Sequence, residues 1–297
     1  MYNNQRVLKY KEITMFNLLI AIIFSALIPV LMKYAHNKNL AEEVILTFNY
    51  LIAVTVSIVF TYFKFDNYID LFSDFKSIVL LLVIGTITGL MYYSGFYFYQ
   101  KSVKENGVSL SIAVGKMGIV IPMILSLILW KEIPETLQWI GILMSIIAIA
   151  IINIKPNDFK GAKIKTSLLL FFIIGGLCDF LNKLFEVSIG AQYTDLFLVL
   201  VFGTAFIASL YNTVKNKNIS KESIAYGIAV GVPNMLTSFF LINALAVMNA
   251  TVVFPIYSGG AIMLSMLWSI YAFNEKLKGK DIVGIILIFI ALVFINL

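Results

Sequence analysis

The chain has 297 residues, of which 60% are hydrophobic and 13% are charged, with a net charge of +6. A soluble domain has about 25% charged residues, so this composition excludes a soluble globular protein, whose interior could not hold so much apolar surface. The single cysteine, Cys178, excludes an intrachain disulfide and a cysteine-based metal site. The lysines lie in short segments between apolar runs, which is typical of membrane proteins and gives no sign of nucleic-acid binding.

Apolar runs long enough to cross a bilayer follow one another along the whole chain. A spanning helix requires about 20 mostly apolar residues. Because the runs are continuously apolar, they predict helices and not the alternating strands of a barrel. The first run is not followed by a small-residue cleavage site, so it is expected to be an uncleaved span and not a signal peptide. The predicted helices are 16–34, 44–62, 77–99, 107–130, 138–153, 166–186, 194–214, 223–247, 250–273 and 281–297.

The third predicted helix carries an aromatic and polar stripe. Tyr93, Tyr97 and Gln100 recur at helical spacing, and Tyr92 is adjacent. A tyrosine hydroxyl inside a span requires a hydrogen-bond partner, so Tyr92, Tyr93 and Tyr97 are candidate substrate-binding residues. An interfacial belt of tyrosines is the alternative.

The fourth predicted helix has Lys116 near its middle, about 14 Å from the nearer end at 1.5 Å per residue. Placing a charged side chain there costs about 2.5–3.5 kcal/mol on insertion scales, and more if it faces lipid. Lys116 is therefore expected to face the interior of the helix bundle. We predict that it binds a carboxylate or phosphate of a ligand; the alternative is a buried ion pair that holds helices together.

The sixth predicted helix places three charged side chains on one face, because Asp179, Lys183 and Glu186 recur at i, i+4 and i+7. Asp179 is the deepest, and it either carries a proton or pairs with Lys183. Glu186 lies near the helix end and is expected to be solvated.

The eighth and ninth predicted helices contribute Asn234, Ser238, Tyr257 and Ser258 as further candidate substrate-binding residues. Together with Lys116, they are expected to line one cavity near the bilayer midplane. Prolines that kink helices, and glycines four residues apart that favour close helix packing, also fall inside spans. These residues are Pro29, Pro122, Pro233 and Pro255, and Gly85, Gly89, Gly227 and Gly231.

The chain contains an internal repeat. Positions 132–153 and 275–296, offset by 143 residues, are identical at seven of 22 places, among them Glu132/Glu275, Gly141/Gly284 and Asn153/Asn296. Each repeat has five helices, an odd number, so the second must enter the membrane from the opposite face. We predict an all-α polytopic membrane protein with ten transmembrane helices in a 5+5 inverted repeat, divided into 1–157 and 158–297.

This pattern resembles the drug/metabolite transporter superfamily, specifically its ten-helix exporters with two EamA-type domains. The resemblance covers nearly the whole chain and rests on the acidic residues that close the fourth and ninth helices, the glycines nine residues later, and the spans that end in Asn. Lys33 and Lys183 are similar to lysine positions of the family, whereas Phe24-Ser25 stands where the family commonly has Trp-Gly.

The resemblance implies a secondary transporter, an exporter of a small metabolite such as an amino acid or organic acid, working by alternating access in the cytoplasmic membrane. A substrate gradient or a coupled proton would drive it, because the chain has no phosphate-binding loop motif. No metal or cofactor is expected, and the expected partners are a small-molecule substrate and the lipid bilayer, with a monomer or a homodimer as the assembly. One alternative is an intramembrane enzyme, although the chain has little clustered His, Asp or Glu for catalysis. The other is a non-transporting scaffold or sensor.

The orientation in the membrane has two opposed indications. If both termini are cytoplasmic, as the resemblance implies, the cytoplasmic segments carry six Lys or Arg residues and the opposite segments carry thirteen. The positive-inside rule predicts the reverse orientation.

Overall fold

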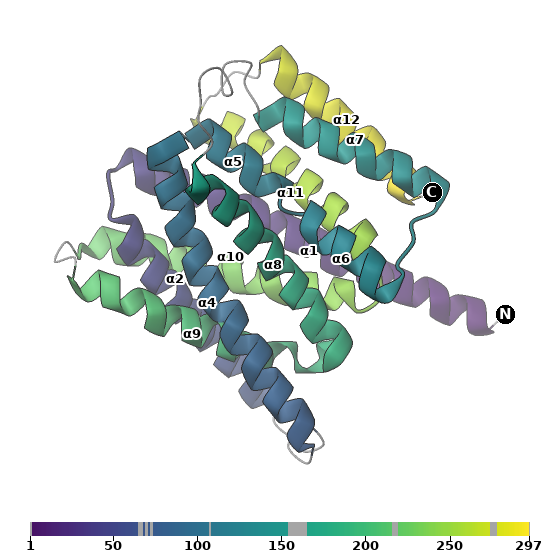
Figure 1. Ribbon diagram of the computed structural model, residues 1–297, viewed down its shortest axis with the longest axis horizontal. Helices are drawn as coiled ribbons and strands as arrows, with labels where there is room; N and C mark the ends of the chain where they lie inside the picture. The colour runs from purple at the N-terminus through teal and green to yellow at the C-terminus, as the bar shows by residue number, and fades with distance from the viewer. Residues whose placement is uncertain are drawn as a thin grey trace. The chain divides into compact units, whose positions relative to one another are not determined.

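The computed structural model describes residues 2–64, 68, 71, 74–106, 108–153, 165–215, 219–273 and 278–296. Over these residues the chain is helical and contains no β-strand, as the sequence predicts (Figure 1). The helices are α1 (Tyr2–Asn37), α2 (Glu42–Phe63), α4 (Phe75–Asn106), α5 (Val108–Met117), α6 (Val120–Trp130), α7 (Thr136–Asn153), α8 (Thr166–Ser188), the short 3-10 helix η2 (Ala191–Tyr193), α9 (Thr194–Lys215), α10 (Lys221–Leu245), α11 (Ala250–Phe273) and α12 (Gly279–Asn296).

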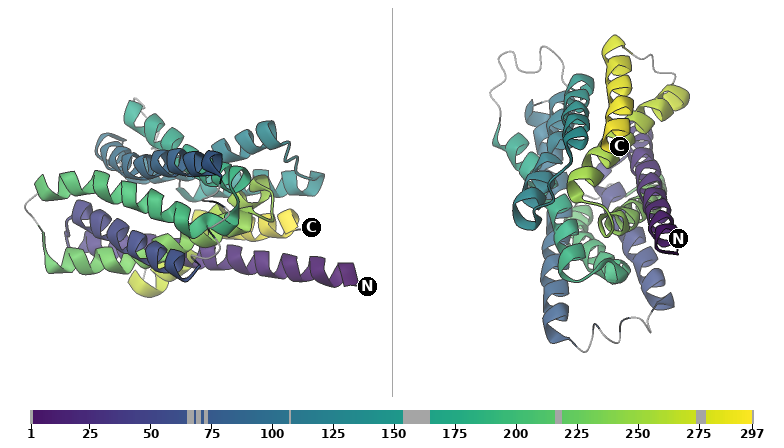
Figure 2. Two further views of the ribbon diagram at one scale, coloured as in Figure 1. Left: turned by 90° about the horizontal axis from the view of Figure 1, so that it is seen from below. Right: turned by 90° about the vertical axis from the view of Figure 1, so that its right-hand side faces the viewer.

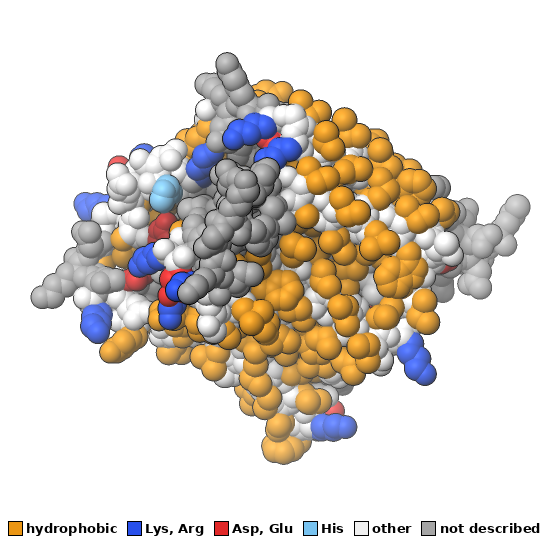
Figure 3. Space-filling view, turned by 45° about the horizontal axis from the view of Figure 1, so that its top comes forward, with side chains coloured by type: hydrophobic (Ala, Val, Ile, Leu, Met, Phe, Trp, Pro, Cys, Tyr) orange, Lys and Arg blue, Asp and Glu red, His pale blue; other side chains and the backbone are white. Residues whose placement is uncertain are grey.

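Seven of the described helices are long and apolar enough to cross a membrane, namely the part of α1 from Met15 onward, α2, α4, α8, α9, α10 and α11. Two shorter apolar helical stretches are Val114–Trp130, which takes in the end of α5 and all of α6, and Thr136–Ile152 of α7. Large hydrophobic side chains remain exposed on the surface, such as Ile207 at 71% and Phe289 at 64%. Figure 3 shows a face on which hydrophobic side chains cover a broad area, with Lys and Arg side chains toward its edges. The protein is therefore a polytopic α-helical membrane protein.

The predicted helix 107–130 is not continuous. The structure divides it into α5 and α6, with a break at Gly118 and Ile119, so the expectation of one helix is wrong. Pro122 has no N–H to donate to the carbonyl of Gly118. The N–H of Ile121 donates to that carbonyl instead, at 3.0 Å, which tightens the chain into a turn.

Proline alone does not explain the break, because other helices continue through their prolines. Pro29 lies inside α1, which Figure 2 shows as one uninterrupted helix. Pro233 lies inside α10 and Pro255 inside α11, which are also continuous. Pro122 differs in that a glycine stands four residues before it, at Gly118, and glycine permits a tight turn that other residues resist.

The helices form two compact units, and each unit takes helices from both halves of the sequence. Unit 1 comprises Met1–Tyr93 and Leu181–Val247, and unit 2 comprises Ser94–Phe180 and Met248–Leu297. The helices α4 and α8 therefore contribute residues to both units. The compact units do not coincide with the sequence halves 1–157 and 158–297.

In unit 1, paired glycines bring helices to backbone contact. A Cβ placed on Gly231 of α10 would lie 2.7 Å from the carbonyl oxygen of Asn49 on α2. A Cβ on Gly89 of α4 would overlap the carbonyl oxygen of Val201 on α9. Gly227 likewise approaches the backbone of α2, whereas a Cβ on Gly85 would meet the side chain of Leu200 on α9. The prediction that these glycines serve close helix packing is confirmed.

In unit 2, α7 and α12 lie side by side and pack reciprocally (Figure 1). A Cβ on Gly141 of α7 would lie 2.6 Å from the side chain of Ile295 on α12, and a Cβ on Gly284 of α12 would meet the side chain of Ile152 on α7. Gly141 and Gly284 are 143 residues apart, and so are Ile152 and Ile295. The contact therefore has local two-fold symmetry.

The acidic residue that closes α6 has a defined structural role. One carboxylate oxygen of Glu132 accepts a hydrogen bond of 2.6 Å from the N–H of Ala250, the first residue of α11. A carboxylate at a helix N-terminus satisfies an otherwise unpaired N–H and interacts favourably with the helix dipole. Its proposed counterpart in the repeat, Glu275, lies outside the described residues, as does Asn274.

Candidate functional site

Lys116 lies in the last turn of α5, immediately before the break. The carbonyl groups at a helix C-terminus favour a cation there by about 0.3–1 kcal/mol, which partly offsets the penalty of a charge in the membrane. Its side chain is exposed, although the helix lies within an apolar stretch. The charge of Asp179, on α8 in the same unit, attracts that of Lys116. The two residues thus form a pair of opposite charges beside the broken helix.

The break is fixed to α8 by a contact between two glycines. A Cβ on Gly176 of α8 would lie 2.5 Å from the carbonyl oxygen of Gly118, so no side chain fits between the two backbones. Asp179 follows Gly176 by three residues, about one turn of helix, and therefore projects from the same face of α8. The same contact that accommodates the break thus places Asp179 near Lys116.

The predicted site residues of unit 1 include a polar cluster at mid-helix depth. The hydroxyl groups of Tyr92 on α4 and Ser238 on α10 lie 3.3 Å apart. The side-chain amide of Asn234 donates to the side-chain oxygen of Asn49 on α2 at 3.1 Å. Asn49 was not among the predicted site residues, although it is an amide inside an apolar run.

Aromatic rings hold Tyr92 in this cluster. The ring of Tyr92 meets that of Phe202 edge to face, with 5.9 Å between ring centroids. The hydroxyl of Tyr50 donates to the backbone carbonyl of Tyr92 at 3.2 Å. Tyr93, the next residue, accepts a hydrogen bond from the side-chain amide of Asn212 on α9. Tyr92 and Tyr93 are therefore both tied to neighbouring helices, as buried hydroxyl groups require.

Lys183 pairs with Glu186 on the same helix. The ammonium of Lys183 lies 2.8 Å from a carboxylate oxygen of Glu186 and donates to the carbonyl of Leu245, at the end of α10, at 3.0 Å. The Glu186 side chain is only 13% exposed, so the expectation that it is solvated is wrong. The physical reason is its ion pair with Lys183, which a buried carboxylate needs.

The remaining predicted site residues belong to unit 2. Tyr97 is 49% exposed, and its ring meets that of Phe98 edge to face. On α11, Tyr257 is half-buried and Ser258 is buried. The structure therefore divides the predicted residues between unit 1, which has Tyr92, Tyr93, Lys183, Asn234 and Ser238, and unit 2, which has Tyr97, Lys116, Asp179, Tyr257 and Ser258.

A bundle of apolar helices with charged and polar side chains in its interior is characteristic of membrane proteins that bind or conduct small solutes. The EamA-like transporter family matches residues 12–154. A protein of Haemophilus influenzae, described as uncharacterized, is 27% identical over 282 residues, which cover 92% of this chain and 94% of that protein. A solved crystal structure shares the fold, with a TM-score of 0.73 at 13% identity over 95% of this chain and 96% of the other.

The match of residues 12–154 to the EamA-like transporter family supports the resemblance to the drug/metabolite transporter superfamily. The resemblance found in the sequence is confirmed. The match indicates a membrane transporter, and the apolar helices show that the protein crosses the membrane several times.

Proposed function

We propose that this protein is a secondary transporter that exports a small metabolite with a carboxylate or phosphate group, such as an amino acid or organic acid, across the cytoplasmic membrane by alternating access. The observation that carries the proposal is the position of Lys116, an exposed lysine at a helix break inside an apolar stretch. Broken helices with charged groups beside the break are the places where secondary transporters bind their substrates.

The proposed architecture is a ten-helix, 5+5 inverted repeat with repeats at 1–157 and 158–297. Two sets of contacts support it. The reciprocal packing of Gly141 and Gly284 relates α7 to α12 by a local two-fold axis. Gly89 approaches Val201 of α9 as Gly231 approaches Asn49 of α2, so equivalent helices make equivalent contacts in unit 1 as well.

Lys116 is proposed to bind the anionic group of the substrate. Asp179 balances the charge of Lys116 through their mutual attraction. An arriving carboxylate or phosphate competes with Asp179 for the ammonium group. Because a charge-assisted hydrogen bond contributes about 1.5–3 kcal/mol, this contact alone accounts for about one to two orders of magnitude in affinity.

Asp179 also offers a route to energy coupling. If the substrate anion takes its place beside Lys116, the displaced carboxylate is more stable as the neutral acid, since an unpaired buried charge is unfavourable. Substrate binding and proton uptake would then be linked. Transport driven by the substrate gradient alone is the alternative, and an imposed pH gradient across liposomes separates the two.

Flux through purified protein in liposomes tests this function. With a panel of radiolabelled amino acids, organic acids and neutral metabolites, we expect saturable uptake of at least one compound that carries a carboxylate or phosphate, and slower uptake of its neutral amide analogue. Chemical conversion of a panel compound without flux would indicate an intramembrane enzyme. Absence of both flux and conversion across the panel would favour a scaffold or sensor.

A further inference from the structure

The helices α2 and α9 of unit 1 form an antiparallel, repeat-related pair. Residues of α2 correspond to residues of α9 at an offset of 152, which aligns Leu46/Leu198, Ala53/Ala205, Ser57/Ser209 and Thr61/Thr213. At one end of the pair, the hydroxyl of Thr47 on α2 lies 2.8 Å from that of Thr213 on α9. At the other end, the ammonium nitrogen of Lys64, which follows α2, lies 3.7 Å from a carboxylate oxygen of Asp195 in the first turn of α9.

The two ends of this pair differ in their acidic residues. The same offset of 152 makes Glu43, in the first turn of α2, the counterpart of Asp195. Glu43 is half-buried, whereas the Asp195 side chain is fully buried. The acidic side chain at the Asp195 end is therefore less accessible than its counterpart at the other end.

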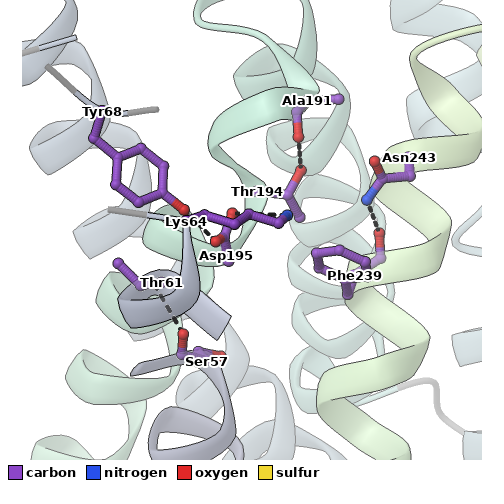
Figure 4. Close-up of polar contacts among 9 residues, drawn as sticks. All are labelled: Ser57, Thr61, Lys64, Tyr68, Ala191, Thr194, Asp195, Phe239 and Asn243. Atoms are coloured by element: carbon purple, nitrogen blue, oxygen red, sulfur yellow. Dashed lines mark hydrogen bonds and ion pairs between the residues drawn. The ribbon is translucent and has the colours of Figure 1, made fainter. Parts of the chain in front are cut away.

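A tyrosine without a counterpart in the repeat closes the end at Asp195. Corresponding residues of α2 and α9 are 152 residues apart in the sequence, whereas the corresponding glycines of α4 and α10, Gly89 and Gly231, are 142 apart. The connection after α2 is therefore 10 residues longer than the connection after α9. Tyr68 lies in this longer connection, and its hydroxyl donates to one carboxylate oxygen of Asp195 (Figure 4). Burial and the neighbouring Asp195 raise the pKa of Tyr68, which keeps its hydroxyl protonated as a donor.

Lys64 completes the cluster and joins a third helix to it. The other oxygen of Asp195 accepts no hydrogen bond from the described residues, and Lys64 lies beside it (Figure 4). The same ammonium group lies 5.2 Å from the ring centre of Phe239 on α10. A buried carboxylate thus depends on one phenol and one partly exposed lysine, and separating the helices at this end would break both contacts.

We propose that Lys64, Tyr68 and Asp195 form a lock that holds this end of the α2–α9 pair closed in one state of the transport cycle and opens in the other. The proposal rests on the transport function proposed above. Alternating access requires each end of the protein to open in turn. A hydrogen bond to a charged group that exists in only one state shifts the balance between the two states by about tenfold or more.

Thiol labelling tests the lock directly, because Cys178 is the only cysteine and can be replaced by serine. Thr194→Cys places a reporter next to Asp195, at a position that is buried while the lock is closed. Tyr68→Phe removes only the hydroxyl and keeps the ring, whose centroid lies 5.9 Å from that of the Tyr193 ring. We expect Tyr68→Phe to increase the labelling rate at Thr194→Cys about tenfold, with a membrane-impermeant reagent.

A reporter at the opposite end controls for general loosening of the fold. Thr213→Cys is also buried, and its labelling should not increase in Tyr68→Phe. Equal increases at both reporters, or no increase at Thr194→Cys, would overturn the lock. Saturating substrate should also change the labelling rate at Thr194→Cys in protein that retains Tyr68. If that rate stays the same in protein with normal flux, the cluster has no part in the transport cycle. Labelling without substrate needs no transport, so a failure of the flux experiment is distinguished from a failure of the lock.

Discussion

Replacing Lys116 by methionine is expected to lower the affinity for an anionic substrate by about tenfold to over a hundredfold, because a charge-assisted contact contributes about 1.5–3 kcal/mol. Methionine is an unbranched chain of similar length without the charge, so insertion of α5 should be at least as favourable as in the parent protein. The measurement is initial uptake by liposomes at matched protein content. Lys116→Arg should restore part of the affinity only if the larger guanidinium fits.

Two controls separate substrate binding from a structural ion pair. Lys104→Met also removes an exposed lysine in the last turn of a helix, and it should leave uptake unchanged. The neutral amide analogue of the substrate should be transported equally by the parent protein and by Lys116→Met. Equal loss of transport for the anion and its amide would show that Lys116 serves only to hold Asp179.

Replacing Gly176 by alanine is expected to destabilise the protein by about 1–3 kcal/mol, as overpacking of a tight contact does. The added methyl group would lie 2.5 Å from the carbonyl oxygen of Gly118, and a backbone atom cannot rotate away as a side chain can. The two helices must move apart, which also shifts Asp179 relative to Lys116. Thermal unfolding in detergent and liposome uptake should therefore both be impaired.

The neighbouring glycine supplies a matched control. A Cβ on Gly175 would meet no heavy atom within 4 Å. Gly175→Ala should be neutral or stabilising, because alanine favours a helix over glycine by about 1 kcal/mol. If Gly176→Ala unfolds at the same temperature as Gly175→Ala, the close contact between α8 and the helix break does not exist in the protein.

The helices could be predicted from the sequence because length and apolar composition determine which segments cross a bilayer. The glycine contacts were also predictable, since glycines four residues apart on an apolar helix have few other roles. The break in the helix at Gly118 could not be predicted from the sequence. Pro122 and Gly118 were both visible, but the sequence does not show the contact between Gly118 and Gly176, and Pro233 lies inside a continuous helix.

Only some of the charged residues inside the helices were predicted, because whether such a residue stands out in the sequence depends on how it is paired. Lys116 is evident because a charge in mid-span is unfavourable without a partner. Asp195 was overlooked because an acid in the first turn of a helix is usually solvated and favoured by the helix dipole. Its burial depends on Tyr68, which lies 127 residues away in the chain. A single sequence contains no signal for such a distant contact.

Counterflow of the identified substrate is the most direct test of the account. Liposomes containing the purified protein are loaded with unlabelled substrate, and uptake of a trace of labelled substrate is followed after dilution. Alternating access predicts a transient accumulation of label above its equilibrium level, which requires a binding site that opens to one side at a time. The accumulation should be absent in Lys116→Met at the same substrate concentration. Label that enters only to equilibrium in the parent protein, at a rate that the internal substrate does not alter, would contradict a transporter that works by alternating access.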